Sequence, residues 1–227
     1  MKEARDSGIP KILYRIIDGK DPCFGGSLEL ATNSKAISLA IEFAGYSRQL
    51  RGPCRFFPIE VELTDDIIFH RRAACETSAS SDFTECSRHF RAYLQSAVSM
   101  MDAFLNRYIL LLEYTHAQVP DGLRGPGRLD DRIDLWVRGI ASRDPSELRQ
   151  GPEWSQFSEL RQERNRLVHA VEPYMGMRIQ DLPRFLNAVR MGLGGLLLRM
   201  RQLAGQPTLG FIERLRTAPK ISFRARG

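Results

Sequence analysis

The sequence lacks the features by which many small proteins are stabilised covalently or by a metal ion. Its 227 residues include only four cysteines, Cys23, Cys54, Cys75 and Cys86. These lie far apart, form no C-x-x-C pair and have no histidine at the spacing of metal ligands, so neither a zinc site nor a redox dithiol is expected. We interpret them as reduced thiols, most of them buried. Stability must then come from a hydrophobic core, for which a hydrophobic content of 43% is sufficient.

Long apolar runs and common enzyme signatures are lacking as well. No apolar run approaches the length that crosses a bilayer, and the first ten residues, MKEARDSGIP, lack the hydrophobic segment of a secretory signal. We therefore expect a cytoplasmic protein without a membrane partner. The sequence contains no G-x-G-x-x-G, P-loop or nucleophile elbow, and no convincing carboxylate pair, which argues against a small-molecule enzyme. No cofactor and no metal are expected.

Positive charge is concentrated near the end of the chain. The net charge is +6, and residues 199–227 account for all of it, with seven basic residues and one acid, Glu213. Such a segment either contacts nucleic acid electrostatically or is a solvated end, and the sequence does not decide between the two. The candidate RNA-binding residues of this tail are Arg214, Arg216, Lys220, Arg224 and Arg226.

Hydrophobic periodicity divides the chain into three parts. Residues 1–80 mix short apolar runs with turn signals, and IEVEL (59–63) alternates like a strand, so we expect a small α+β or irregular N-terminal extension. After the polar loop ETSASSD (76–82), residues 81–206 show helical patterns typical of an antiparallel bundle. Residues 207–227 form the basic tail. The predicted fold class is therefore mainly α.

The bundle is predicted from apolar residues spaced three and four apart. We expect helices at residues 83–117, 128–142, 154–171 and 181–205. Asp181 is the candidate cap of the last helix, which stops at Gly205. Inside it, three glycines permit close approach of a neighbouring helix: Gly192, Gly194 and Gly195.

The third helix carries an unusual concentration of polar groups, RQERNRLVHA (161–170). Its apolar face is formed by Phe157, Leu160, Leu167, Val168 and Val171. At 100° per residue the centre of this face coincides with Arg164. A guanidinium there must be paired or must face a solvated cleft or a subunit interface, because an isolated buried charge costs several kcal/mol, by order of magnitude. Arg161, Asn165 and His169 follow on the adjoining flank, where the amide can orient the imidazole.

The segment Arg164-Asn165-x3-His169 resembles the R-x4-6-H signature of HEPN domains. The context is similar too: a long first helix with a mid-helix acid, Asp102, then the motif inside an apolar helix late in the bundle, and another long helix after it. The resemblance covers residues 83–205. It implies a dimer of all-α subunits whose motif helices meet at the two-fold axis and form one composite cleft. In active members of the family this cleft cleaves RNA without a metal ion.

The resemblance implies catalytic roles for Arg164, Asn165 and His169. A histidine can exchange a proton with a ribose 2′-OH or a leaving oxygen, and an arginine can hold the phosphate. Asn165 would orient His169 or contact the substrate, with Asp102 supporting Arg164 and Arg161 in a further supporting role. On one straight helix, Arg164 and His169 point about 140° apart. A two-fold partner or a local bulge must close this gap.

Two functions stay open. The first is a metal-independent endoribonuclease that cleaves unpaired RNA by 2′-OH attack, as a toxin or phage-defence effector. Its partners would be RNA, a second copy of the chain, and an antitoxin or defence-system protein. The second is a non-catalytic HEPN module that dimerises or binds RNA or a partner protein, with Arg164 holding the interface. The intact arginine, asparagine and histidine favour the first.

Other interpretations of the same residues are simpler. Arg164 could pair with a core acid such as Asp102, while His169 caps a helix end before Pro173. HEPN toxins paired with nucleotidyltransferase antitoxins typically carry a tyrosine two residues after the histidine, where Val171 stands here, so regulation by adenylylation is not expected. The remaining histidines have no partner at motif spacing and are expected to be structural or exposed: His70, His89 and His116.

Overall fold

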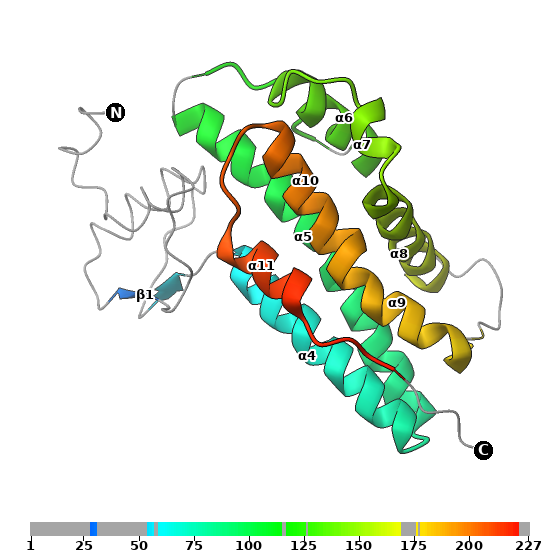
Figure 1. Cartoon of the computed structure of the whole chain (residues 1–227). Coiled ribbons are helices and arrows are strands. Elements are labelled where there is room, and N and C mark those ends of the chain that lie inside the picture. The colour runs from blue at the N-terminus through cyan, green and yellow to red at the C-terminus, as the bar shows by residue number, and fades with distance from the viewer. Residues whose placement is uncertain are drawn as a thin grey trace.

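A computed structural model describes residues 28–30, 54–56, 59–114, 117–125, 127–168, 176 and 178–222. The mainly α prediction is confirmed over this part of the chain (Figure 1). Two three-residue strands pair antiparallel, with Leu28 opposite Phe56. The strands and helices are β1 (Leu28–Leu30), β2 (Cys54–Phe56), α4 (Ile59–Ala79), α5 (Phe83–Tyr114), α6 (Leu129–Gly139), α7 (Ser146–Arg149), α8 (Pro152–Val168), α9 (Leu182–Ala188), α10 (Gly195–Leu203) and α11 (Gly210–Thr217). A 3-10 turn, η1 (Ile179–Asp181), precedes α9, and a π-helical segment, η2 (Val189–Gly194), joins α9 to α10.

The first long helix, α4, corrects the prediction of a strand at IEVEL. These residues open α4, which packs along α5 for most of its length (Figure 1). Glu60 is buried and forms an ion pair of 3.1 Å with the buried Arg107 of α5. An alternation of only five residues suits a strand or a helix, and here a partner 47 residues away decides it. The polar loop is also shorter than predicted, since α4 continues to Ala79.

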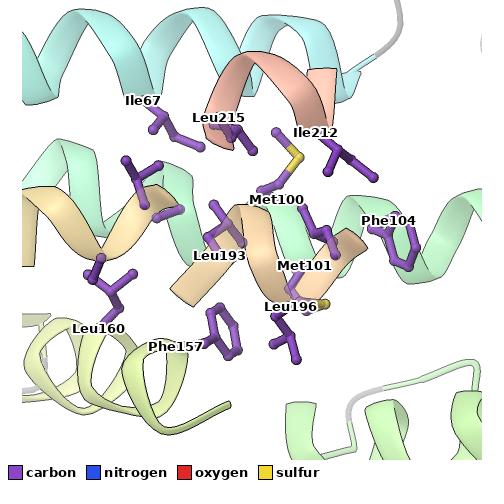
Figure 2. Close-up of a cluster of buried hydrophobic side chains, with 14 of the residues drawn as sticks. Ile67, Met100, Met101, Phe104, Phe157, Leu160, Leu193, Leu196, Ile212 and Leu215 are labelled. Carbon is purple, nitrogen blue, oxygen red and sulfur yellow. The ribbon is translucent and has the colours of Figure 1, made fainter. Parts of the chain in front are cut away.

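The core is built around α5, as the spacing of its apolar residues predicts. Side chains from α4, α8, η2, α10 and α11 converge on it, and Figure 2 shows Met100 and Met101 of α5 in this cluster with Leu193 and Leu196. The predicted core positions of α5 that the structure finds buried are Phe90, Leu94, Ala97, Val98, Met101, Phe104, Leu105, Tyr108 and Ile109.

The last predicted helix is formed by α9, η2 and α10, which follow one another without a break, and its middle segment, η2, is π-helical (Figure 1). The prediction that its glycines permit close approach is confirmed on two sides. A Cβ on Gly192 would lie 3.0 Å from Cβ of Gln156 and 3.1 Å from the backbone nitrogen of Phe157, both in α8. A Cβ on Gly194 would lie 2.9 Å from Cγ of Arg216 in α11. The missing side chains thus set the spacing between η2 and its two neighbours.

The segment predicted as a basic tail divides into parts. Residues 210–217 form α11, whose Phe211, Ile212 and Leu215 are buried in the same core as α5. Residues 223–227, with Arg224 and Arg226, lie outside the described residues. Over its described length this segment belongs to the bundle, because its apolar residues are needed to cover α4 and η2.

The residues after α11 are tied to the bundle by two polar side chains. Arg71 of α4 is 4% exposed and donates to the carbonyl oxygens of Leu186 at 2.6 Å and of Pro219 at 2.5 Å. Asn187 accepts from the N–H of Ile221 at 2.8 Å and donates to its carbonyl oxygen at 2.7 Å. Buried backbone groups of this segment therefore have partners from α4 and α9.

None of the helices in the described part of the chain is both long enough and apolar enough to cross a bilayer.

We predict that Gly192→Ala lowers the free energy of unfolding by up to about 2 kcal/mol. Alanine favours a helix over glycine by about 1 kcal/mol, but the new methyl group would press on the backbone of α8, which cannot yield, and overpacking of this kind costs about 1 to 3 kcal/mol. Urea unfolding followed by circular dichroism measures the change. Gly127→Ala is the matched control, since the nearest atom to its Cβ is 3.8 Å away. A stabilised Gly192→Ala variant would contradict the close approach.

Candidate functional site

The motif residue Arg164 lies between two buried residues of α8, Leu160 and Leu167, as predicted. Its side chain is half-buried. Its Nε is buried and has no hydrogen-bond partner among the described residues, while its Nη1 donates to Oδ1 of the exposed Asn165 at 2.9 Å. Val168, one turn further, is 48% exposed although the sequence places it on the apolar face. The apolar stripe thus reaches the surface at Val168, although Leu167 beside it is buried.

The other candidate residue of the motif, His169, lies outside the described residues, as do Val171 and Pro173. Described α8 ends at Val168, directly before the histidine. The expected separation of about 140° between Arg164 and His169 and the bulge or dimer that would close it therefore stay predictions.

The acid expected to support Arg164 is bound elsewhere. Oδ1 of Asp102 accepts from Nη1 of Arg132 in α6 at 2.6 Å. Arg132 is only 7% exposed and also donates to Asn106 Oδ1 at 2.8 Å and to the carbonyl oxygen of Leu123 at 3.0 Å. The role predicted for Asp102 thus needs correction: it holds α6 against α5.

The acidic side chains near Arg164 are already paired with other arginines. Asp130 of α6 pairs with Arg161, which places that predicted supporting residue in the contact between α6 and α8. The carboxylate of Glu163 accepts hydrogen bonds from Nη2 and Nε of Arg166, at 2.6 and 2.9 Å. Among the described residues, no carboxylate pairs with Arg164. Its guanidinium is held in place by Asn165 and has hydrogen-bonding capacity to spare.

A half-buried arginine of this kind can bind an anion. Burial restricts the side chain and lowers the local dielectric, and the guanidinium presents several N–H donors in a rigid fork that fits a phosphate or a carboxylate. Asn165, which holds one of these donors, is exposed on the same helix. Nε of Arg164 is enclosed by the protein, so an anion would be bound by the other two nitrogens of the guanidinium.

The candidate RNA-binding residues of the C-terminal segment are more constrained than their charge suggests. Nη2 of Arg214 pairs with Asp65 of α4 at 2.5 Å, and Nη1 of Arg216 lies 3.4 Å from Glu213. Lys220 is exposed. Arg201, which contributes to the sequence charge, is buried and donates to the carbonyl oxygen of Pro207 and the hydroxyl of Tyr108, each at 2.8 Å. Much of the positive charge here therefore stabilises the bundle.

Sequence analysis missed a histidine pair between α4 and α5. Nδ1 of His70 lies 3.0 Å from Nδ1 of His89, and the ring of the exposed Phe69 contacts both imidazoles. At this distance one of the two nitrogens must donate and the other accept, so a single hydrogen bond joins the two rings. Burial and the neighbouring His89 lower the pKa of His70, while Asp66 opposes the shift. Nineteen residues separate the two histidines, so no local pattern could reveal them, and His116 lies outside the described residues.

No arrangement for a metal ion is found among the described residues, since nowhere in them do three histidine, cysteine or acidic side chains come together. Cys86 is buried, with its Sγ donating to the carbonyl oxygen of Ala74 at 3.4 Å, and Cys75 is half-buried. Burial raises the pKa of both thiols. These two cysteines agree with the interpretation as reduced, unreactive thiols, while nothing is described of the side chains of Cys23 and Cys54.

Comparison with known proteins leaves the function to be argued from the site itself. No protein-family model matches the chain, and no curated protein and no solved structure matches it significantly.

We predict that Asp102 is coupled energetically to Arg132 and independent of Arg164. In a double-mutant cycle, Asp102→Asn and Arg132→Met should couple by about 0.5 to 3 kcal/mol in the free energy of unfolding, as expected for groups that share hydrogen bonds. Asp102→Asn and Arg164→Met should add within about 0.5 kcal/mol. Urea unfolding of the single and double variants tests both cycles, and strong coupling of Asp102 to Arg164 would restore the role expected from the sequence.

Proposed function

We propose that the protein is a metal-independent endoribonuclease of the HEPN type, which acts on unpaired RNA as a homodimer. The observation that carries the proposal is the state of Arg164: a half-buried guanidinium, positioned by Asn165, to which no carboxylate of the described residues is bound. The buried arginines of the core have their donors bound within the bundle, by carboxylates at Arg132 and Arg107 and by carbonyl oxygens at Arg71 and Arg201. Among the described residues, Arg164 has only the amide of Asn165.

In the proposed reaction Arg164 binds the scissile phosphate. His169 exchanges a proton with the ribose 2′-OH or with the leaving 5′-oxygen. The 2′-oxygen attacks phosphorus and the bond from phosphorus to the 5′-oxygen breaks, which gives a 2′,3′-cyclic phosphate and a 5′-hydroxyl. Arg164 stabilises the charge that develops on the phosphoryl oxygens. Asn165 holds the guanidinium of Arg164 through the contact of 2.9 Å, and its predicted role toward His169 or the substrate stays a prediction.

The dimer is part of the proposal because one helix does not direct both groups at one phosphate. With two copies, Arg164 of one protomer could meet His169 of its partner in a composite cleft. A toxin or phage-defence role, with an antitoxin or another defence protein as partner, follows from the HEPN resemblance and is proposed on that ground alone.

We predict that His169→Ala reduces RNA cleavage by about a hundredfold to ten-thousandfold, the usual contribution of a general acid or base. The wild-type protein should cleave single-stranded RNA in EDTA, and its products should carry 2′,3′-cyclic phosphates detectable by mass spectrometry. Arg164→Ala should also inactivate the protein. Arg72→Ala, at an exposed ion pair on α4, is the control and should cleave normally.

Three results would contradict the ribonuclease proposal. The first is a wild-type protein that cuts no RNA, and the second is a His169→Ala variant that cuts as well as wild type. The third is cleavage that requires Mg²⁺ and leaves 5′-phosphates, which would indicate a different reaction class. Circular dichroism of both variants separates loss of activity from loss of folding.

A non-catalytic dimerisation module is the second candidate, and the exposure of Val168 favours it. An apolar side chain that is 48% exposed, one turn beyond a half-buried arginine, suits the edge of a protein interface. In this case Arg164 would bind a group of the partner protomer. Dimerisation is common to both candidates, so RNA cleavage is the observation that separates them.

We predict that Val168→Asp converts a homodimer into a monomer, because it places a charge in an interface that should bury on the order of 1,000 Å² in total. Light scattering at micromolar concentration measures the change in mass. Phe69→Asp, at a similarly exposed apolar residue on α4, is the control and should remain dimeric. A monomeric wild-type protein would exclude the dimer altogether.

A further inference from the structure

A pocket opens beside the motif helix, between the C-terminal part of α8 and the start of α9. It has a volume of about 230 Å³. Glu163 and Arg166 of α8 form one side of it, and Arg178 and Asp181 form the other. These α8 residues flank Arg164 in sequence, so the pocket and the proposed cleavage site share one helix.

Most charged groups at this pocket already have partners. Arg166 binds Glu163 through both nitrogens of its fork. Arg184 lies 3.4 Å from Glu159 and stacks over the ring of Phe185 at 4.6 Å. These pairs leave little charge available for a ligand.

Two side chains at the pocket remain without a partner among the described residues. Asp181 occupies the N-cap position of α9, as predicted, but its carboxylate makes no capping hydrogen bond. The exposed Arg178, three residues earlier, has no ion pair or side-chain hydrogen bond within the described part of the chain. One free cation and one free anion thus face the same small pocket.

The balance of these groups selects the kind of ligand. A phosphate would be attracted by Arg178 but repelled by Asp181, whereas a neutral ligand with adjacent donors and acceptors would satisfy both. Pockets for complete small ligands usually have about 300 to 1,000 Å³, so this pocket suits a single heterocyclic base better than a nucleotide. The guanidinium of Arg184, which covers the ring of Phe185 with one face, can stack on a base with the other.

We propose that this pocket binds a guanine base of single-stranded RNA. Guanine presents O6 and N7 as acceptors, which an arginine fork binds with two hydrogen bonds. On the neighbouring edge, N1–H and the 2-amino group are donors for the two oxygens of Asp181. Adenine presents the acceptor N1 where guanine has a donor, which would face the carboxylate unfavourably. The inference rests on the proposed function, because it names the base recognised next to the cleaved phosphate.

The test measures binding rather than cleavage. Fluorescence anisotropy compares 2′-O-methyl oligoadenylates that carry one guanine, one hypoxanthine or only adenine, none of which can undergo 2′-OH attack. Wild-type protein should bind the guanine oligonucleotide on the order of tenfold more tightly than the adenine one, as expected for one bidentate base contact. Hypoxanthine, which lacks the 2-amino group, should bind with intermediate affinity.

Two variants assign the contact. Asp181→Asn should abolish the preference for guanine and leave affinity for the adenine oligonucleotide unchanged, and Arg178→Met should weaken the preference. Asp65→Asn, an equivalent substitution on α4, is the control and should keep the preference. Since the Asp181 carboxylate makes no capping bond, its replacement should not unfold α9, which thermal melting verifies.

Each outcome bears on a different part of the argument. Equal affinity for guanine and adenine oligonucleotides, or an Asp181→Asn variant that still prefers guanine, would overturn the pocket assignment. Free GMP that binds as tightly as the oligonucleotide would overturn the assignment to RNA in favour of a guanine nucleotide. Selective binding by a protein that cleaves nothing would support the pocket and reject the ribonuclease. Cleavage without base preference would do the opposite.

Discussion

The close contact between η2 and α8 is the constraint on which the candidate site depends. With a hydrogen atom in place of a side chain, Gly192 lets η2 and α8 approach so closely that a Cβ there would lie only 3.1 Å from the backbone nitrogen of Phe157. This approach carries Leu160 and Leu167 into the core and leaves Arg164, between them, half-buried. A looser contact would expose the guanidinium to bulk water, where an anion binds weakly because the dielectric is high.

How much of the fold could be predicted depended on the range of the deciding interactions. The spacing of apolar residues in α5 was sufficient, because thirty-two residues of amphipathic pattern outweigh any local ambiguity. It was not sufficient at the start of α4, where the buried pair between Glu60 and Arg107 outweighs the strand-like alternation. The π-helical turn of η2 was also beyond prediction, since Gly192 and Gly194 indicate close packing without revealing which hydrogen-bond pattern achieves it.

The same distinction holds at the candidate site. The position of Arg164 on the apolar face follows from helical geometry and was predicted correctly. The partner of Asp102 was not predicted correctly, because the sequence does not show which arginine of another helix lies closest to it in the fold. Burial of Arg201 and of α11 was missed for a related reason: net charge counts residues without regard to the apolar ones between them, here Phe211, Ile212 and Leu215.

The ion pairs of the described chain have one property in common, since each of them uses an arginine and none a lysine. A guanidinium stays protonated at any pH at which a protein remains folded, so alkaline conditions do not break these ion pairs. The ion pairs that join α6 and α4 to α5 should therefore persist in alkaline solution, where a lysine in place of Arg132 or Arg107 would lose its charge.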